Sequence, residues 1–435
     1  MAILPSQTGG VDMGMRPLRR AREVRDNEPA RPGVKRRPIL PVTLKGMVVA
    51  VLLFLGALFL ANLLGSAPAQ GPGANPVFRE TEPSPSLVPH ALALLQAASA
   101  KQGFPRLVWE RELQGKSFLR RGGGCLFACT QQGEVLALDP RGGAVLWEVS
   151  LGGWISSPPL FRDGNLYTGN ANRRLYALDG RSGRVLWFFP TQGEIISSPV
   201  PGGGMVFFFA DNDSVFHLVN RLYVVDGKTG ALRWSYETPN WSKSPPAVGD
   251  ALVYAAGYER RLVALSLENG TEAWSYQADN IIDTSPALLG DTLVASTVDG
   301  EVLGLDALRG QVKWKASLPG PAWTAHDASR RLFLYYDRTG TLSAFLPDGR
   351  VAWSFRREGL LFPLVREEEG EIMVFDDGGR VHLLDSASGA RTAILHLPFT
   401  DPVSAEADDG LLFVASGSGK LACFDLAQVE WLFPR

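Results

Sequence analysis

The residues that could do chemistry are few and scattered along this chain. Its five histidines, which include no pair at metal-ligand spacing, are His90, His217, His326, His382 and His396. The sequence holds no GxSxG nucleophile motif, no phosphate-binding loop of the GxxxxGK type and no HExxH zinc motif. Three cysteines are too few for a disulfide framework, and they do not have zinc-ligand spacing. The sequence therefore predicts no catalytic residues, no cofactor-binding residues and no metal ligands.

One segment, Asp211-Asn212-Asp213, does gather oxygen ligands. Carboxylate and amide oxygens are the ligands that Ca²⁺ prefers, but the remaining ligand positions of an EF-hand loop are missing. We therefore interpret this segment as a solvated loop rather than a calcium site.

The elements that must position any site follow from a repeat of about 40 residues. Residues 133–149 (GEVLALDPRGGAVLWEV), 173–189 (RRLYALDGRSGRVLWFF) and 220–236 (NRLYVVDGKTGALRWSY) are versions of one unit. A tryptophan near the end of each unit marks the period, and Ile394 replaces it once. The marker tryptophans, which we predict to be structural, are Trp109, Trp147, Trp187, Trp234, Trp274, Trp314, Trp353 and Trp431. With Ile394 they make nine markers, which bound eight units.

Each unit contains four short segments rich in β-forming residues and separated by Gly, Asp, Asn or Pro. The turn between the third and fourth segments recurs as Asp, three residues, then Gly, as in Asp139/Gly143. An Asp oxygen can accept a hydrogen bond from the turn backbone, and Gly can take the positive φ that closes a hairpin. The turn chemistry therefore supports a strand on either side of it.

Four antiparallel strands repeated in this way are typical of a propeller blade. We predict an all-β, eight-bladed β-propeller of four-stranded antiparallel blades, preceded by one transmembrane helix. A seven-bladed ring with one decayed unit outside it is the alternative. The segment Leu107 to Leu113 is predicted to close the ring as an extra or replacing outer strand of the last blade.

The chain before the repeats indicates a membrane anchor. Residues 1–45 carry ten Lys and Arg against four Asp and Glu, and residues 46–67 (GMVVAVLLFLGALFLANLLGSA) carry no charge. A helix of this length spans the hydrocarbon layer of roughly 30 Å. Because positive residues stay on the cytoplasmic side, the amino terminus is predicted to be cytoplasmic and the repeats extracytoplasmic. The basic head lacks interleaved aromatic residues, so no nucleic-acid partner is predicted.

The predicted domains are a basic cytoplasmic segment (1–45), a transmembrane helix (46–67), a Pro/Ala/Gly-rich linker (68–106) and the propeller (107–435). The expected location is a bacterial inner membrane, crossed once. A signal peptide cleaved near Ala67-Pro68-Ala69 is the alternative. The long head and the long apolar run argue against it.

The repeats resemble the pyrroloquinoline-quinone-type repeat, whose hallmark is an LYALD-like strand, a T/S-G turn and a following LW. The resemblance covers Arg106 to Arg435 and is most specific in units two to five. It implies one of two branches: the quinoprotein alcohol dehydrogenases, or the non-catalytic propeller of the outer-membrane barrel-assembly machinery. A dehydrogenase of this family would need a carboxylate base, calcium ligands and an adjacent cysteine pair. This chain has no neighbouring cysteines and no CxxCH haem motif, so it is closer to the second branch, and no cofactor is predicted.

The three cysteines are interpreted as follows. Cys125 and Cys129 are four residues apart on a predicted strand, so their Cα atoms should be about 13 Å apart, beyond the reach of a disulfide. Cys129 aligns with Gly169, and Cys423 aligns with Ala137. Since both replace small buried residues, we predict that Cys129 and Cys423 are core thiols.

Three tryptophans lie outside the repeat register, namely Trp154, Trp241 and Trp323. Each is expected in a loop that leads from the outer strand of one blade to the inner strand of the next, so the three should gather on one face near the central channel. Tryptophan is enriched among residues that dominate interfaces, although packing under neighbouring loops is an equally weighted alternative. The loops between second and third strands open on the same face. They add Asp211, Asp213, Tyr258, Asp337 and Asp376 to this predicted partner-binding rim.

These observations predict a membrane-anchored, extracytoplasmic, non-catalytic scaffold that binds a protein or peptide partner in the cell envelope, as in outer-membrane protein assembly. Binding would use the rim aromatics and exposed strand edges. The alternative is a quinone-dependent dehydrogenase-like enzyme or a quinone- or ligand-binding sensor.

Overall fold

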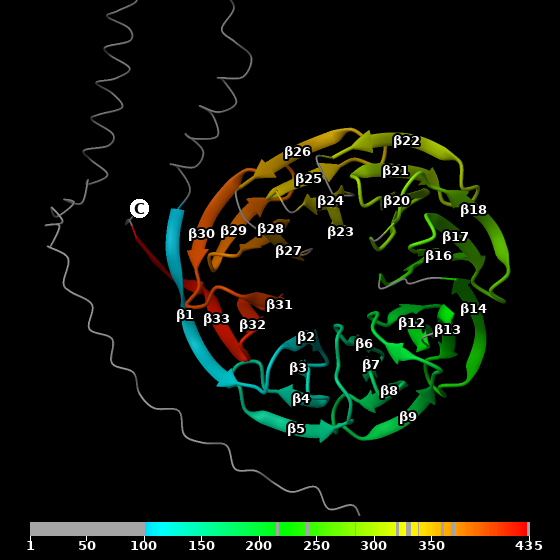
Figure 1. Ribbon diagram of the computed structural model, residues 1–435. Helices are drawn as coiled ribbons and strands as arrows, with labels where there is room; N and C mark the ends of the chain where they lie inside the picture. Colours follow the sequence, from blue (N-terminus) through cyan, green and yellow to red (C-terminus); the bar gives the residue numbers. More distant parts are fainter. Residues whose placement is uncertain are drawn as a thin grey trace, which may run out of the picture. The chain divides into compact units, whose positions relative to one another are not determined.

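The computed structural model describes residues 101–432, with gaps at 215–216, 240–243, 283, 319–321, 328–331, 338, 358–360 and 367–369. Only the backbone is described for residues 212–214, 217–219, 239, 322–327 and 361–366. The predicted segments 1–45 and 46–67 lie outside the described residues, as does most of the predicted linker. Every regular element in the described residues is a β-strand, and Figure 1 shows the sheets following one another around a ring.

The strands form antiparallel groups of four that follow the repeat. From the centre of the ring outward, the first four groups are β2 (Ser117–Gly122), β3 (Cys125–Thr130), β4 (Glu134–Leu138) and β5 (Val145–Ser150); β6 (Leu160–Arg162), β7 (Asn165–Asn170), β8 (Arg174–Asp179) and β9 (Val185–Pro190); β10 (Glu194–Ile195) and β11 (Val200–Gly202), which both pair with β12 (Met205–Ser214), then β13 (His217–Asp226) and β14 (Leu232–Pro239); and β15 (Ala247–Val248), β16 (Leu252–Ala256), β17 (Arg261–Ser266) and β18 (Glu272–Gln277).

The later groups continue the same order. They are β19 (Ala287–Leu289), β20 (Thr292–Ser296), β21 (Glu301–Asp306) and β22 (Val312–Ser317); β23 (Ala322–Asp327), β24 (Leu332–Asp337), β25 (Thr341–Phe345) and β26 (Val351–Arg356); β27 (Leu361–Arg366), β28 (Glu371–Asp376), β29 (Arg380–Asp385) and β30 (Arg391–His396); and β31 (Pro402–Asp408), β32 (Leu411–Ser416), β33 (Lys420–Trp431) and β1 (Lys101–Glu112).

The core lies between the groups rather than inside one of them. The second and third strands are buried on both faces, so they are continuous runs of apolar residues such as LVYAA in β16. For example, Phe207 and Leu222 of the third group pack against Val253 and Leu265 of the fourth. Because each sheet buries its faces on both neighbours, the ring has to be complete to shield its core.

The marker tryptophans join each group to the next. Trp274 of β18 lies opposite Ala264 of β17, and its Nε1–H donates to the carbonyl oxygen of Ala307, in the next group, at 3.0 Å. The same bond, at 2.8 to 3.1 Å, is made by Trp109, Trp147, Trp234, Trp314 and Trp353. Trp187 is the exception, because the carbonyl of Gly227 accepts the hydroxyl of Tyr167 instead, at 2.9 Å. The predicted structural role of these tryptophans is thus a link between neighbouring groups.

The predicted Asp-to-Gly turns are present, and they receive the indoles. In the turn of the seventh group, Gly389 has φ 67° and its N–H donates to the carbonyl of Asp385 at 2.8 Å. A Cβ atom at Gly389 would lie 2.5 Å from the indole of Trp353 in the preceding group. Glycine is therefore needed here both for the positive φ and for the close approach of the ring.

The seventh group replaces its tryptophan with a different pair. Ile394 of β30 lies opposite His382 of β29, at the register where other groups place tryptophan opposite a small residue. The larger imidazole therefore compensates in part for the smaller side chain of Ile394. His382 is fully buried, and its ring lies 5.5 Å from that of Phe355.

The N-terminal strand closes the ring, as predicted. β1 pairs antiparallel with β33 and supplies the outer strand of the last group, with Trp109 opposite Cys423. It begins at Lys101, six residues before the predicted start of the propeller, and residues Lys101–Gly103 also pair parallel with β30. The structure corrects the assignment of Trp431 as a repeat tryptophan. Trp431 lies at the end of the long strand β33, opposite Gly103, because Trp109 already occupies the last tryptophan position.

Candidate functional site

The two sets of loops that were predicted to share one face lie at the same ends of the strands. In most groups, the residue that follows the outer strand donates its N–H to the turn between the second and third strands. Ala278 donates to Arg260 at 2.7 Å, and Arg357 donates to Gly340 at 2.7 Å. This recurring bond ties the connection to the next group against the second-to-third turn. We call the surface formed by both kinds of loop the loop face.

Trp154 is held on the loop face by a fixed backbone. Its carbonyl oxygen accepts the N–H of Ala171 at 2.9 Å, and the side chain of Asn172 donates to the carbonyls of Leu151 and Gly152 at 2.9 and 3.0 Å. The Trp154 side chain nevertheless remains 46% exposed. A large apolar ring is thus presented to solvent on a backbone that is already ordered, which lowers the entropic cost of binding.

The other two predicted rim tryptophans are placed differently. Trp323 lies in β23, where it pairs with Tyr336, so the structure corrects its assignment to a loop. The segment around it is drawn into the sheet as a six-residue inner strand. Trp241 lies outside the described residues. Gathering of the three tryptophans remains a prediction.

Two predicted acidic rim residues are turn residues with occupied carboxylates. Asp337 is 3% exposed, and its Oδ1 accepts the N–H groups of Thr339 and Thr341 at 2.9 Å each. Asp376 is 1% exposed and accepts the N–H of Arg380 at 3.0 Å in the same way. These aspartates stabilise the turn rather than project from it. Alignment of the repeats could have shown this, because Thr297 and Ser416 hold the same position and accept the equivalent N–H.

The second and third strands of the third group are longer than those of the second group. β12 and β13 have ten residues each, compared with six in β7 and β8, and they pair from Met205/Asp226 to Ser214/His217. Asp211 is 7% exposed within this hairpin, so it does not form part of an open acidic loop. Asp213 pairs with Leu218 further along the hairpin, and its side chain lies outside the described atoms.

A charged network surrounds Asp376 in the seventh group. Its Oδ2 lies 2.8 Å from Arg357 Nε, 2.9 Å from Arg380 Nε and 3.1 Å from His382 Nε2. Although burial opposes it, the hydrogen bond from His382 together with the two arginines holds the pKa of the Asp376 carboxyl well below its usual range. Burial lowers the pKa of His382, and the nearby Asp376 only partly offsets this. The network therefore favours a neutral histidine beside an ionised aspartate.

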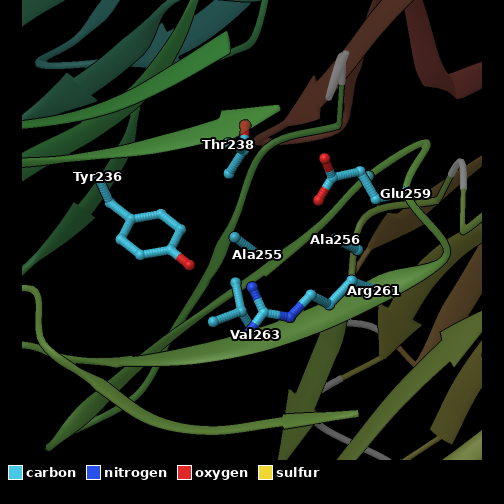
Figure 2. A pocket seen from close by; sticks show the side chains of 8 residues that line it. Tyr236, Thr238, Ala255, Ala256, Glu259, Arg261 and Val263 are labelled. Carbon is cyan, nitrogen blue, oxygen red and sulfur yellow. The ribbon is translucent and has the colours of Figure 1, made fainter. Parts of the chain in front are cut away.

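A small pocket that the sequence did not predict lies next to the predicted rim residue Tyr258. Figure 2 shows Tyr236, Thr238, Glu259 and Arg261 around it. Its volume is about 30 Å³, enough for one or two water molecules, whereas pockets for small-molecule ligands measure roughly 300 to 1,000 Å³. Burial raises the pKa of the Glu259 carboxyl, although Arg261 opposes this. The pocket suits a water molecule or the end of one partner side chain.

The described residues do not fit the cysteine chemistry of the quinone enzymes. All three cysteines are free, and Cys129 and Cys423 are fully buried, as predicted. Burial raises the pKa of each of these two thiols to about 12, so both stay protonated and unreactive. Within the described parts of the chain, no group of three or more His, Cys, Asp or Glu residues is arranged to hold a metal ion.

Comparisons with known proteins support this architecture. A family model described as outer membrane protein assembly factor BamB matches residues 131–219 and 209–331. The structure is similar to BamB from Moraxella catarrhalis, with 19% identity over 74% of this chain and 99% of that chain and a TM-score of 0.59. It is similar to the computationally designed Ika8 protein, with 13% identity over 75% and 99% and a TM-score of 0.63.

An enzyme also shares the fold. Quinohemoprotein alcohol dehydrogenase ADHIIG from Pseudomonas putida HK5 is similar over 76% of this chain and 78% of that chain, with 15% identity and a TM-score of 0.58. No curated protein sequence matches this chain significantly. The likenesses show a β-propeller, and the family match supports repeats of the pyrroloquinoline-quinone type. Since a scaffold and an enzyme share this fold, function has to be argued from the residues.

Within the described residues, no helix has the length and apolar character needed to cross a membrane. The predicted span, residues 46–67, lies outside them.

Proposed function

We propose that this protein is an eight-bladed propeller, anchored in the bacterial inner membrane by residues 46–67, that acts outside the cytoplasm as a non-catalytic scaffold for a protein partner. Outer-membrane protein assembly is the process that we favour. The family match to an assembly factor and the likeness to BamB from Moraxella catarrhalis support this proposal.

The observation that carries the proposal is the presentation of Trp154. The Trp154 side chain is 46% exposed, and the hydrogen bonds of its loop fix the backbone that carries it. Interfaces concentrate their binding energy in such aromatic anchors. The small pocket beside Tyr258 offers a second place on the loop face for a partner side chain.

The proposal is tested by capture of partners from native membranes with the full chain. Trp154→Ala, and the triple variant that also replaces Trp241 and Trp323, should lose a specific crosslinked partner while unfolding at an unchanged denaturant concentration. The matched control is Leu308→Ala. Leu308 is 64% exposed, but it lies in the turn between β21 and β22, at the opposite ends of the strands. An unchanged partner profile in the triple variant would reject the loop face as the binding surface.

A second candidate function, a quinone-dependent enzyme or sensor, is supported by the likeness to the quinohemoprotein dehydrogenase. It predicts that the full chain binds pyrroloquinoline quinone in the presence of Ca²⁺ and reduces a dye when an alcohol is added. We expect neither on the scaffold proposal. Saturable quinone binding with alcohol-dependent dye reduction would reject the scaffold proposal and support the enzyme.

A further inference from the structure

Six outer strands, namely β5, β9, β14, β18, β22 and β26, are each the last strand of their sheet within the described residues and so have a free backbone edge. The side chains protect most of these edges. In each of these strands, the residues on either side of the tryptophan point away from the neighbouring group that the indole contacts. In β22 these residues are Lys313 and Lys315, and in β26 they are Ala352 and Ser354. Charged or small outward residues are a common way to prevent an edge strand from pairing with another chain.

The edge strand β9 lacks this protection. It pairs with β8 on one side only, and within the described residues it is the last strand of its sheet. Figure 1 shows it on the outside of the ring. Its outward residues are Leu186, which is 38% exposed, and Phe188, which is 50% exposed. Among the outer strands β5, β9, β14, β18, β22 and β26, no other carries two large apolar residues at these positions.

The group that contains β9 is basic. Residues 160–190 contain five arginines and two aspartates, a formal charge of +3 in a protein whose total is −2. Arg174 and Arg184 are exposed, and the guanidinium of Arg174 lies 4.7 Å from the centre of the Phe188 ring. Of the two aspartates, Asp179 is occupied by the N–H and hydroxyl of Ser182, at 2.8 and 2.7 Å. The edge therefore offers backbone donors and acceptors, an apolar surface and excess positive charge together.

We propose that β9 is a docking edge for an extended segment of a partner protein in which apolar and acidic residues alternate. The segment would add a strand to the second group, with its apolar side chains over Leu186 and Phe188 and its carboxylates near Arg174 and Arg184. Pro190 ends the edge because it has no N–H to donate, so docking is limited to Val185–Phe189. This inference rests on the proposed scaffold function and assigns a second surface to it.

The test measures binding of fluorescent peptides to the full chain. The probe is a peptide of alternating valine and glutamate, and its reference is the valine–lysine peptide. The key variant combines Leu186→Ala with Phe188→Ser, which copies the uncharged residues that β26 carries at the same positions. We expect the acidic peptide to bind about tenfold more weakly to this variant than to the parent. Arg174→Glu with Arg184→Glu should weaken it similarly.

Two further measurements make the test decisive. Hydrogen exchange of the Val185–Phe189 amides should slow when the acidic peptide is added, whereas exchange in β22 should not change. Equal binding of the lysine peptide, or unchanged affinity in the Leu186→Ala/Phe188→Ser variant with its unfolding midpoint preserved, would overturn the assignment of β9. The scaffold proposal fails separately, because it is judged on partner loss in the Trp154→Ala variant. A Leu186→Ala/Phe188→Ser variant that keeps its crosslinked partner and its peptide affinity would reject only the docking edge.

Discussion

At the scale of single residues, one contact is used repeatedly to hold this molecule together. Each marker indole from Trp109 to Trp353, except that of Trp187, combines a hydrogen bond to the next group with close packing over a turn glycine, so it replaces a hydrogen bond to water while burying a large apolar ring. The two demands on the glycine can be separated experimentally, because other glycines of positive φ have no indole above them.

Gly389→Ala should destabilise the protein by about 1 to 3 kcal/mol more than Gly410→Ala, since the added methyl group must displace the Trp353 ring. The two positions have φ of 67° and 72°, but a Cβ atom at Gly410 would have no heavy atom within 4 Å. The backbone strain is therefore matched, and urea unfolding of both variants measures the clash alone. Equal losses of stability in the two variants would show that the Trp353 ring moves aside without an energetic cost.

His382 should make the protein sensitive to mild acid. Its pKa in the folded state is lowered, so the unfolded chain binds more protons as pH falls below the ordinary value of 6.5, and stability is lost from there toward the folded pKa. Asp376 adds a second loss of stability at lower pH. Although burial opposes this, its folded pKa is also lowered, because His382, Arg357 and Arg380 favour the ionised carboxylate. In His382→Ala, which copies the alanine of four other groups, the slope just below pH 6.5 should shrink. An unchanged slope in urea unfolding across that interval would assign the sensitivity to other groups.

At the scale of elements, the features that recur with the repeat could be predicted from the sequence. The strands, the turn glycines and the closing role of residues 107–113 are all periodic, and the structure confirms them. The status of Trp431 was not predictable from spacing alone, because a straight strand β33 replaces the expected turn. The burial of the predicted rim residues Asp337 and Asp376 was missed for a different reason. An aspartate that is exposed and an aspartate that stabilises a turn look alike in a single repeat. The hydrogen bonds at Asp337 and Asp376 distinguish them, and in the sequence only the comparison with Thr297 and Ser416 at the same position could have done so.

The closing strand β1 should be required for a cooperative fold. A chain that begins after Leu113 loses the outer strand of the last group and the Trp109 link to Pro140. We expect it to unfold in more than one step, or to be insoluble, whereas a chain that begins at residue 101 should unfold in one step. Circular dichroism during urea unfolding measures this. Identical transitions for the two chains would show that β33 tolerates a free edge.

At the scale of the whole molecule, the proposed membrane anchor (residues 46–67) and the location of the propeller can be tested separately. Full-length protein should stay in the membrane pellet at alkaline pH, and deletion of residues 46–67 should release it, because the longest uncharged run that does not overlap this segment, residues 83–100, is shorter and contains three prolines. Protease added outside spheroplasts should reach the repeats but not residues 1–45. Release by alkali of a shorter chain that lacks the amino terminus would instead indicate signal-peptide cleavage.

The pairing of β1 with β33 also has a consequence for biogenesis. In the export that we propose, β1 emerges first and is without its partner until β33 arrives, so an incomplete translation product cannot close the ring. Such a fragment would leave the edge of β1 unpaired, together with the edge of the last strand made, and proteases can recognise such exposed edges. The β1–β33 pairing that stabilises the finished molecule therefore also makes ring closure depend on delivery of the entire chain.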